Sequence, residues 1–383
     1  MCVPGSGSRY ANSGSERAPN RCAAPGRSAR RVAQGTGARV SVRIGLDVMG
    51  GDHAPDAVLR GCLDALPLLG DRDTLVLIGP EPEIREYLDE HKVEDPRLEI
   101  DDTTDVIAMG ASPMEAVRQQ PGSTIVRLAT LGSRKATVPC DAVLSAGNTG
   151  ACVAAGQMLM RRLPGVHRPG IAVTIPAFHG PVVLCDAGAN PEPRSNHLWQ
   201  YGVMAEVYAR RVLQIDAPRV GVMNIGSEEA KGSGLAKDSA EMLKRTPGLN
   251  FIGYIEGRDF FAGAADVVVT DGFVGNTVLK MAEGLAQSIF EALASEIFET
   301  DPDLALKFEP IVKSIYKKND YHEHGGAPLL GVSGVMMIAH GSSEARTITN
   351  AIRNTLEYVH RCVNDAIVER LGALERIETG EPA

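Results

Sequence analysis

The sequence predicts an α/β protein in which helices cover both faces of a largely parallel β-sheet. From residue 42 onward, short apolar runs alternate with longer segments of helical periodicity, the pattern of βαβ units. The 383 residues, 44% hydrophobic and 23% charged, suffice for one large core or two modest ones, and no internal repeat is visible. The expected strands are 42–48, 74–79, 142–146, 171–176, 182–186, 219–225, 251–255, 266–270 and 335–339; the expected helices are 55–69, 149–163, 195–213, 236–245, 276–298 and 343–371.

The segment 142–160 is uncharged and long enough to span a membrane, which is compatible with a transmembrane helix. Asn148, Thr149, Gln157 and three glycines interrupt it. Its Ala-Val-Leu-Ser run followed by Gly-Asn-Thr-Gly is typical of a strand, a turn and a helix start. We therefore expect two elements of a globular fold here.

The charge of the chain is unevenly distributed. Residues 1–40 carry seven arginines and one glutamate, a net of +6, so the remaining residues carry −15. A body this acidic disfavours nucleic acid, and an anionic partner needs a local basic patch. The candidate patches are Arg161–Arg162 with Arg168, Arg210–Arg211, and Arg194.

The first 41 residues lack a hydrophobic period, so we expect a disordered Arg/Ser/Gly-rich tail. An over-extended start or a lineage-specific tail accounts for it at least as well as an organelle transit peptide. The seven cysteines form no CxxC pair, and His322-Glu323-His324 has no third His or Cys nearby, so no metal site is assigned.

Five polar or glycine-rich segments follow expected strands: 47–53, 145–150, 224–232, 270–276 and 340–343. Ligands bind beyond the carboxyl ends of strands in open parallel sheets, so we expect these segments to form one site. Helix starts at Thr149, Asn276 and Ser343 would offer N–H groups to an anion, although helix capping alone explains such residues singly. No GxxxxGK[ST] or correctly placed GxGxxG is present, which argues against nucleotide binding by those motifs.

Seven motifs resemble one family, the bacterial acyl-ACP:phosphate acyltransferases of phospholipid synthesis, in order over about residues 42–370. They are Asp-Val-Met-Gly-Gly-Asp-His-Ala-Pro (47–55), Ser-Ala-Gly-Asn-Thr-Gly-Ala (145–151), Asp-Ala-Gly-Ala-Asn (186–190), Asn-Ile-Gly-Ser-Glu-Glu-Ala-Lys-Gly (224–232), Thr-Asp-Gly-Phe-Val-Gly-Asn (270–276), Tyr-His-Glu-His-Gly-Gly-Ala (321–327) and Ala-His-Gly-Ser-Ser (339–343). The resemblance implies a three-layer α/β/α fold like that of phosphotransacetylases and isocitrate dehydrogenases, in a homodimer. The chain departs from it in its first 41 residues and in Arg118-Gln-Gln-Pro-Gly, where relatives often carry more basic residues.

The implied reaction transfers a long-chain acyl group from acyl carrier protein (ACP) to inorganic phosphate, with no cofactor and no metal. Phosphate is the nucleophile, so positioning and oxyanion stabilisation must supply most of the catalysis. The candidate catalytic residues are Lys231, Asn148, Asp271 and His340, although Lys231 is equally well read as a solvated loop lysine. The candidate substrate-binding residues are Gly50, Gly51, Asp52, Gly147, Thr149, Gly150, Asn190, Gly275, Asn276, Ser342 and Ser343. The alternatives are a phosphotransacetylase acting on short acyl-CoA, a decarboxylating dehydrogenase and a non-catalytic lipid-enzyme scaffold.

We expect a catalytic α/β domain at 42–371 and a flexible C-terminus at 372–383. Within the domain, 275–318 is expected to form a helical hairpin with an apolar tip around Phe298 and Leu304. A pair of helices packed in a dimer fits the same pattern. The resemblance implies a cytoplasmic, peripherally membrane-associated enzyme that supplies acyl phosphate to the integral-membrane glycerol-3-phosphate acyltransferase.

Overall fold

The computed structural model describes residues 41–177, 179–300, 310 and 325–379. The chain divides into two units, residues 1–34 and 35–383, and the described residues all belong to the second. Except for Ser41, the expected tail lies outside the described residues, and so do residues 380–383.

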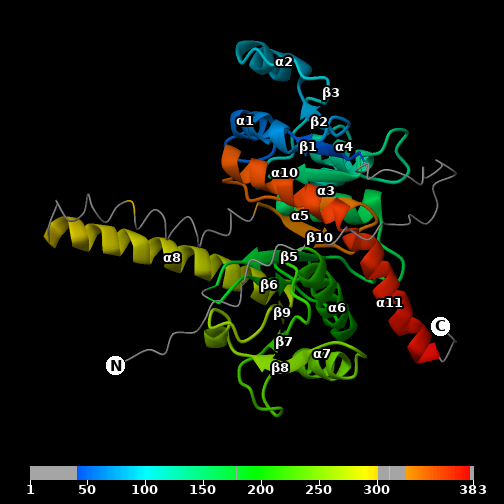
Figure 1. Cartoon of the computed structure of the whole chain (residues 1–383), viewed down its shortest axis with the longest axis vertical. Helices are drawn as coiled ribbons and strands as arrows, with labels where there is room; N and C mark the ends of the chain where they lie inside the picture. The colour runs from blue at the N-terminus through cyan, green and yellow to red at the C-terminus, as the bar shows by residue number, and fades with distance from the viewer. Residues whose placement is uncertain (1–40, 178, 301–309, 311–324, 380–383) are drawn as a thin grey trace. The chain divides into compact units, whose positions relative to one another are not determined.

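Eleven described strands form one sheet in the order β3-β2-β1-β4-β11-β10-β5-β6-β9-β7-β8 (Figure 1). The nine expected strands are present, and β3 and β10 are additional. The strands are β1 (Arg43–Asp47), β2 (Thr74–Gly79), β3 (Leu98–Asp102), β4 (Ala142–Ser145), β5 (Gly170–Ile175), β6 (Val182–Cys185), β7 (Val220–Met223), β8 (Phe251–Ile255), β9 (Val267–Val269), β10 (Ala327–Leu330) and β11 (Val335–Ile338).

The sheet consists of two parallel blocks that run in opposite directions. β3, β2, β1, β4 and β11 are parallel to one another, and β6, β9, β7 and β8 form the second parallel block. Three successive antiparallel pairings, β11–β10, β10–β5 and β5–β6, join the blocks. Three reversals place the carboxyl ends of the two blocks at opposite edges of the sheet, so strand direction alone does not bring the five polar segments together.

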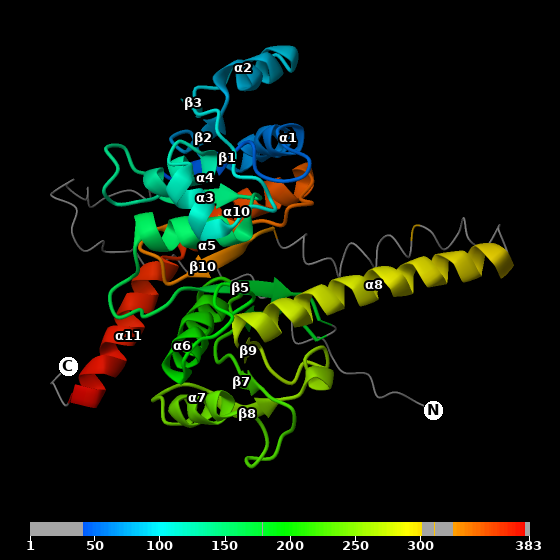
Figure 2. The ribbon, with the colours of Figure 1, turned by 180° about the vertical axis from the view of Figure 1, so that it is seen from behind.

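Two buried clusters, one on each face of the sheet, give the fold its three layers. Side chains alternate across a strand, so Leu75 and Leu77 of β2 belong to one cluster and Val76 and Ile78 to the other. The first cluster includes residues of α1, α6, α7, α10 and α11, and the second includes residues of α3, α4 and α5. Accordingly, α10 lies toward the viewer in Figure 1, whereas α3 and α5 do so in Figure 2.

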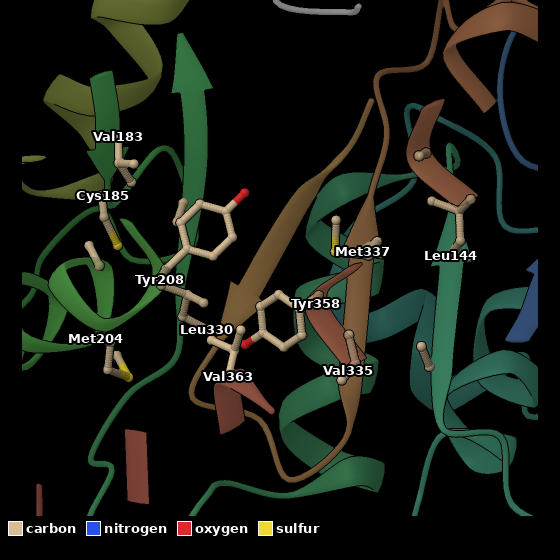
Figure 3. Packing of buried hydrophobic residues seen from close by; sticks show 14 of the residues in the cluster. Leu144, Val183, Cys185, Met204, Tyr208, Leu330, Val335, Met337, Tyr358 and Val363 are labelled. Carbon is tan, nitrogen blue, oxygen red and sulfur yellow. The ribbon is translucent and has the colours of Figure 1, made fainter. Parts of the chain in front are cut away.

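The first cluster continues across both strand blocks. Figure 3 shows Leu144 of β4 and Met337 of β11 in the same packed layer as Val183 of β6. The rings of Tyr208 in α6 and Tyr358 in α10 lie 6.2 Å apart, which joins the helices over the two blocks. One core therefore holds both halves of the sheet in place.

The described helices are α1 (Asp56–Ala65), α2 (Glu81–Glu90), α3 (Pro113–Gln119), α4 (Thr124–Leu131), α5 (Thr149–Ala155), α6 (Ser195–Arg211), α7 (Gly234–Lys244), α8 (Gly272–Thr300), α10 (Ala345–His360) and α11 (Val363–Thr379). A π-helical turn, Gly156–Met160, continues α5. The single helix expected at 343–371 is in fact two, because Cys362 adopts φ 52° between α10 and α11. α11 also continues past the boundary expected at residue 371.

Helix α8 extends away from the sheet (Figure 2). It includes residues 275–300 of the hairpin expected at 275–318, while 301–309 and 311–318 lie outside the described residues, so the hairpin stays a prediction. Among the helices described, none combines the length and hydropathy required to cross a bilayer.

Candidate active site

Three of the five polar segments meet at the carboxyl ends of β1, β4 and β11. The Asp52 N–H donates to Gly341 O at 2.7 Å, which joins the loop after β1 to the loop after β11. A Cβ added to Gly50 would lie 2.8 Å from Gly147 N, so the loops after β1 and β4 are also in contact. Gly51 adopts φ 110°, and an added Cβ would lie 2.9 Å from Gly341 O. Only glycine allows these backbones to approach so closely.

A buried carboxylate, Asp47, lies beneath this junction at the end of β1. Its side chain is 2% exposed, and its Oδ2 accepts a hydrogen bond from Ser145 Oγ at 2.7 Å. The Ser145 hydroxyl in turn accepts from the Gly147 N–H at 3.0 Å. Burial raises the pKa of Asp47, and the hydrogen bond from Ser145 opposes that rise. Asp47 therefore holds the glycine loop of β4 in position through Ser145.

Asn148 is fully engaged by protein groups. Its Oδ1 accepts from the Ala151 N–H at 3.0 Å and so caps α5. Its Nδ2 lies 2.9 Å from Met109 O and 3.2 Å from both Ala108 O and Ala111 O. The side chain thus ties the start of α5 to residues 108–111, which suits a positioning role better than direct contact with substrate.

His340 and Lys280 form a polar centre that joins the two strand blocks. Lys280 Nζ lies 2.8 Å from His340 Nε2 and 3.0 Å from Glu283 Oε2. An ammonium can only donate, so the ring nitrogen is the acceptor in this contact. Nδ1 faces Ser342 Oγ at 2.8 Å. Helix α8 follows β9 of the second block, and it places Lys280 against the loop after β11 of the first block.

A second buried carboxylate, Asp186, anchors the start of α8. Its Oδ1 accepts from the N–H groups of Ile171 (2.9 Å), Gly188 (3.2 Å) and Ala189 (3.0 Å), and its Oδ2 accepts from the Asn190 N–H (2.7 Å). Burial raises the pKa of Asp186, and these four N–H donors oppose that rise. The carboxylate thereby folds the loop after β6 into a compact turn.

Helix α8 begins against this turn. The Gly272 N–H donates to Asn190 O at 2.8 Å. An added Cβ on Gly275 would lie 1.9 Å from Asp186 O, so no larger residue fits there without displacement. Asp271 Oδ1 accepts from the Val274 N–H at 2.8 Å, which makes Asp271 a cap of the first helical turn. The predicted residues Asp271 and Gly275 thus determine where α8 lies.

Lys231 belongs to a loop that makes no hydrogen bond or ion pair with the other four segments within the described residues. Its ammonium pairs with Glu228 at 2.7 Å, and both side chains are more than half exposed. Asn224 organises the loop by donating from Nδ2 to Gly226 O (3.1 Å) and Lys231 O (3.2 Å). A catalytic role for Lys231 stays a prediction.

The remaining predicted residues divide into exposed and packed positions. Thr149, Asn276 and Ser342 are exposed, as a substrate-binding role requires, whereas Ser343 is buried. Gly150 packs on α3, because an added Cβ would lie 2.5 Å from Pro113 Cγ. Asn190 Nδ2 donates to Pro169 O and Tyr201 Oη, and its side chain is thereby engaged within the protein.

Sequence reasoning missed Lys280, Asp47, Ser145 and Asp186 as site residues. Both aspartates follow a buried apolar strand, a signal that was available in the sequence. Lys280 lies four residues after Asn276, one helical turn along α8, but nothing local indicates that this turn meets His340. In the described part of the chain, no group of three or more His, Cys, Asp or Glu side chains is placed to hold a metal ion.

Comparison with known proteins identifies the family of the chain. The model of a family described as "Fatty acid synthesis protein" matches residues 42–366. The phosphate acyltransferase of Desulforamulus reducens is 43% identical over 331 residues, covering 86% of this chain and 97% of that protein. That of Dictyoglomus thermophilum is 39% identical over 337 residues, covering 87% and 98%.

Solved structures support the fold class. A phosphotransacetylase from Streptococcus pyogenes has a TM-score of 0.56 at 16% identity, covering 83% of this chain and 94% of that one. The EutD phosphotransacetylase from Staphylococcus aureus has a TM-score of 0.53 at 15% identity with the same coverage. At these identities the likeness establishes the α/β architecture alone.

Proposed function

Because this chain belongs to the phosphate acyltransferase family, we propose that it transfers a long-chain acyl group from acyl carrier protein to inorganic phosphate. The carbonyl carbon exchanges its bond to the carrier's sulfur for a bond to a phosphate oxygen. The proton of hydrogen phosphate passes to the departing thiolate, so the products are acyl phosphate and the free thiol of the carrier. No oxidant, reductant or cofactor is needed.

Phosphate as the nucleophile is consistent with the state of the cysteines. Cys62, Cys140, Cys152 and Cys185 are all buried and free. Burial raises the pKa of Cys62 and Cys152 to about 12 and that of Cys140 to about 11, and it raises the pKa of Cys185 as well. A thiol that holds its proton is a poor nucleophile at neutral pH. These four cysteines are therefore poor candidates for an acylated intermediate.

The observation that supports the proposed chemistry best is the pairing of Lys280 with His340 beside the glycine loops at 50–52 and 147–150. The Lys280 ammonium supplies a positive charge and N–H donors for phosphate, and Glu283 and His340 hold its position. The first N–H groups of α5, at Thr149 and Gly150, have no partner within the helix and suit the developing oxyanion. Asp47, through Ser145, and Asn148 would keep these donors in place.

The decisive experiment incubates the purified full chain with phosphate and either palmitoyl-ACP or acetyl-CoA, and traps acyl phosphate with hydroxylamine. We expect kcat/KM for palmitoyl-ACP to exceed that for acetyl-CoA by more than about tenfold. A preference for acetyl-CoA would instead support the phosphotransacetylase alternative. Absence of acyl phosphate from both substrates would reject the reaction.

The exposed face of α8 supports a homodimer and a peripheral membrane contact. Met281, Leu285, Ile289 and Leu293 follow one another at four-residue spacing and are 69%, 63%, 49% and 47% exposed. Contiguous exposed apolar surface of this kind marks an interaction site. We propose that this stripe packs against a second copy of the chain, and that Phe298, 64% exposed near the end of α8, faces the membrane.

Membrane contact would bring the acyl phosphate to the integral-membrane glycerol-3-phosphate acyltransferase that consumes it. Flotation with anionic liposomes tests it by comparing the wild type with Phe298→Asp. Loss of flotation with the oligomer intact supports the proposal. Equal flotation would move the membrane contact elsewhere on the protein.

A further inference from the structure

A concentration of positive charge lies where two segments far apart in the sequence meet. Residues 161–169 connect the π-helical turn to β5, and residues 191–197 lead into α6. Gln200 of α6, which is buried, accepts from the His167 N–H at 2.8 Å and donates to Gly165 O at 2.7 Å. Both ends of one buried carboxamide therefore fix the first segment against the helix.

The side chains of the two segments form a single cluster, which we call the cationic cluster. The rings of His167 and His197 lie 6.3 Å apart, and Asn196 Nδ2 lies 3.2 Å from His167 Nδ1. The Arg194 N–H donates to His197 Nδ1 at 3.1 Å, and Arg162 donates to His167 O. The cluster consists of Arg162, His167, Arg168, Arg194 and His197.

The charges of the cluster are not neutralised within the described residues. Arg162, Arg168 and Arg194 form no ion pair there, and Glu192 is the one acid in the two segments. The pKa of His197 is lowered, first by burial and then by the positive charges of Arg168, His167, Arg194 and Arg162. The start of α6 adds the positive end of a 17-residue helix dipole. An anionic partner would relieve this repulsion.

The shape of the cluster indicates a surface rather than a pocket for a small ion. Arg162, His167, Arg168 and Arg194 are exposed, and His197 is half-buried. They belong to a body that carries −15 outside residues 1–40, so docking of an acidic macromolecule needs a local basic patch of this kind. Complementary charge of this kind sets where and how fast an acidic protein docks.

The cluster also adjoins the candidate active site. Asn190 Nδ2 donates to Pro169 O and to Tyr201 Oη (2.8 Å), which ties the residue after Arg168 to the loop that holds the start of α8. The same Asn190 accepts from the Gly272 N–H through its carbonyl oxygen. A partner on the cluster would therefore sit beside the loop from which α8 runs to His340.

We propose that the cationic cluster is the docking surface for the acidic face of the carrier protein that delivers the thioester. This inference rests on the proposed function, since it needs a protein-borne substrate. The cationic cluster combines arginines from two of the three basic patches named from the sequence. The third patch, Arg210–Arg211, is not part of it. These two arginines lie at the opposite end of α6 and serve as the matched control.

The test compares Arg168→Glu/Arg194→Glu with the control Arg211→Glu/Arg210→Glu, which changes the net charge equally. Each is assayed with lauroyl-ACP and with lauroyl-pantetheine, an uncharged thioester that lacks the carrier protein. We expect the KM for lauroyl-ACP, divided by the KM for lauroyl-pantetheine, to rise about twentyfold in the cluster variant and less than about twofold in the control. The rise should shrink in 0.5 M NaCl, because salt screens exposed charges.

Binding of unacylated carrier protein, measured by titration calorimetry, provides a readout independent of turnover. The affinity should fall in the cluster variant by a factor similar to the rise in KM. An unchanged KM ratio and unchanged affinity in a folded cluster variant would overturn the docking site while leaving the proposed function intact. If the wild type neither turns over lauroyl-ACP nor binds the carrier, the proposed function itself fails.

Discussion

The contact between α8 and the Asp186 loop makes Gly275 the position at which a single added methyl group should be most damaging. In Gly275→Ala the new Cβ would lie 1.9 Å from the Asp186 carbonyl oxygen and 3.0 Å from its carbonyl carbon. Both partners are backbone, so no side chain can rotate away. Since real Cβ contacts are not found below 3.0 Å, the helix must move by about 1.1 Å.

The magnitude follows from two opposing terms. Forcing a methyl group into a packed contact costs about 3 kcal/mol at the upper end of the usual range. Alanine in place of glycine within a helix stabilises the folded state by about 1 kcal/mol. We therefore expect the free energy of unfolding to fall by about 2 kcal/mol. A shift of about 1 Å at Lys280 would lengthen its 2.8 Å contact with His340 beyond hydrogen-bonding distance, so kcat/KM should fall about a hundredfold.

Urea unfolding measures the stability change, and hydroxylamine trapping with palmitoyl-ACP measures the activity. Gly284→Ala is the matched control, because Gly284 lies in the same helix and an added Cβ there would meet nothing within 4 Å. The control should gain up to about 1 kcal/mol from helix propensity and keep its activity. An unfolding free energy within 0.5 kcal/mol of the wild type together with kcat/KM within about twofold in Gly275→Ala would refute the reasoning.

Three further predictions concern other parts of the site and α8. The pKa of Asp47 is raised in the folded protein, so its ionisation disfavours folding as the pH rises above about 4. In urea unfolding at pH 4.5 and pH 8, the stability of Asp47→Asn relative to the wild type should therefore be greater at pH 8. The same stability difference at both pH values would contradict this. Lys280→Met should lower kcat/KM about a hundredfold or more, with Lys280→Arg recovering part of it, whereas equal loss in both would point to geometry alone. Leu285→Asp with Ile289→Asp should convert a dimer to monomer in sedimentation equilibrium, and an unchanged dimer would exclude the α8 stripe from the interface.

The sequence by itself determined the architecture of the protein. Strands such as Leu75–Ile78 are apolar at every position, and helical segments lie between them, so the sheet must be covered on both faces. Five described elements escaped prediction, and most of them lack that signal. β3 (Leu-Glu-Ile-Asp-Asp) is an acidic edge strand, β10 contains Pro328, α2 buries only Ile84, and α3 has only seven residues. α4 was missed although six of its eight residues are buried.

The candidate site could be predicted in part. Its glycine loops follow from local rules, since glycines after apolar strands permit close backbone approach, and 50–52, 147–150 and 340–342 do lie together. The sequence could not decide whether Lys231 is catalytic or a solvated loop lysine. Its ion pair with Glu228 and the position of its loop depend on the tertiary structure.

What only the tertiary structure decided was which distant groups meet. Three antiparallel pairings reverse the second strand block, so local pattern alone would send its loops to the far edge of the sheet. The Asp186 turn and Gly275 direct α8 back to the first block and bring Lys280 to His340, 60 residues away along the chain. Side-chain pairing over such separations depends on the direction of a helix axis in space, and that direction is set by packing contacts that have no periodic trace in the sequence.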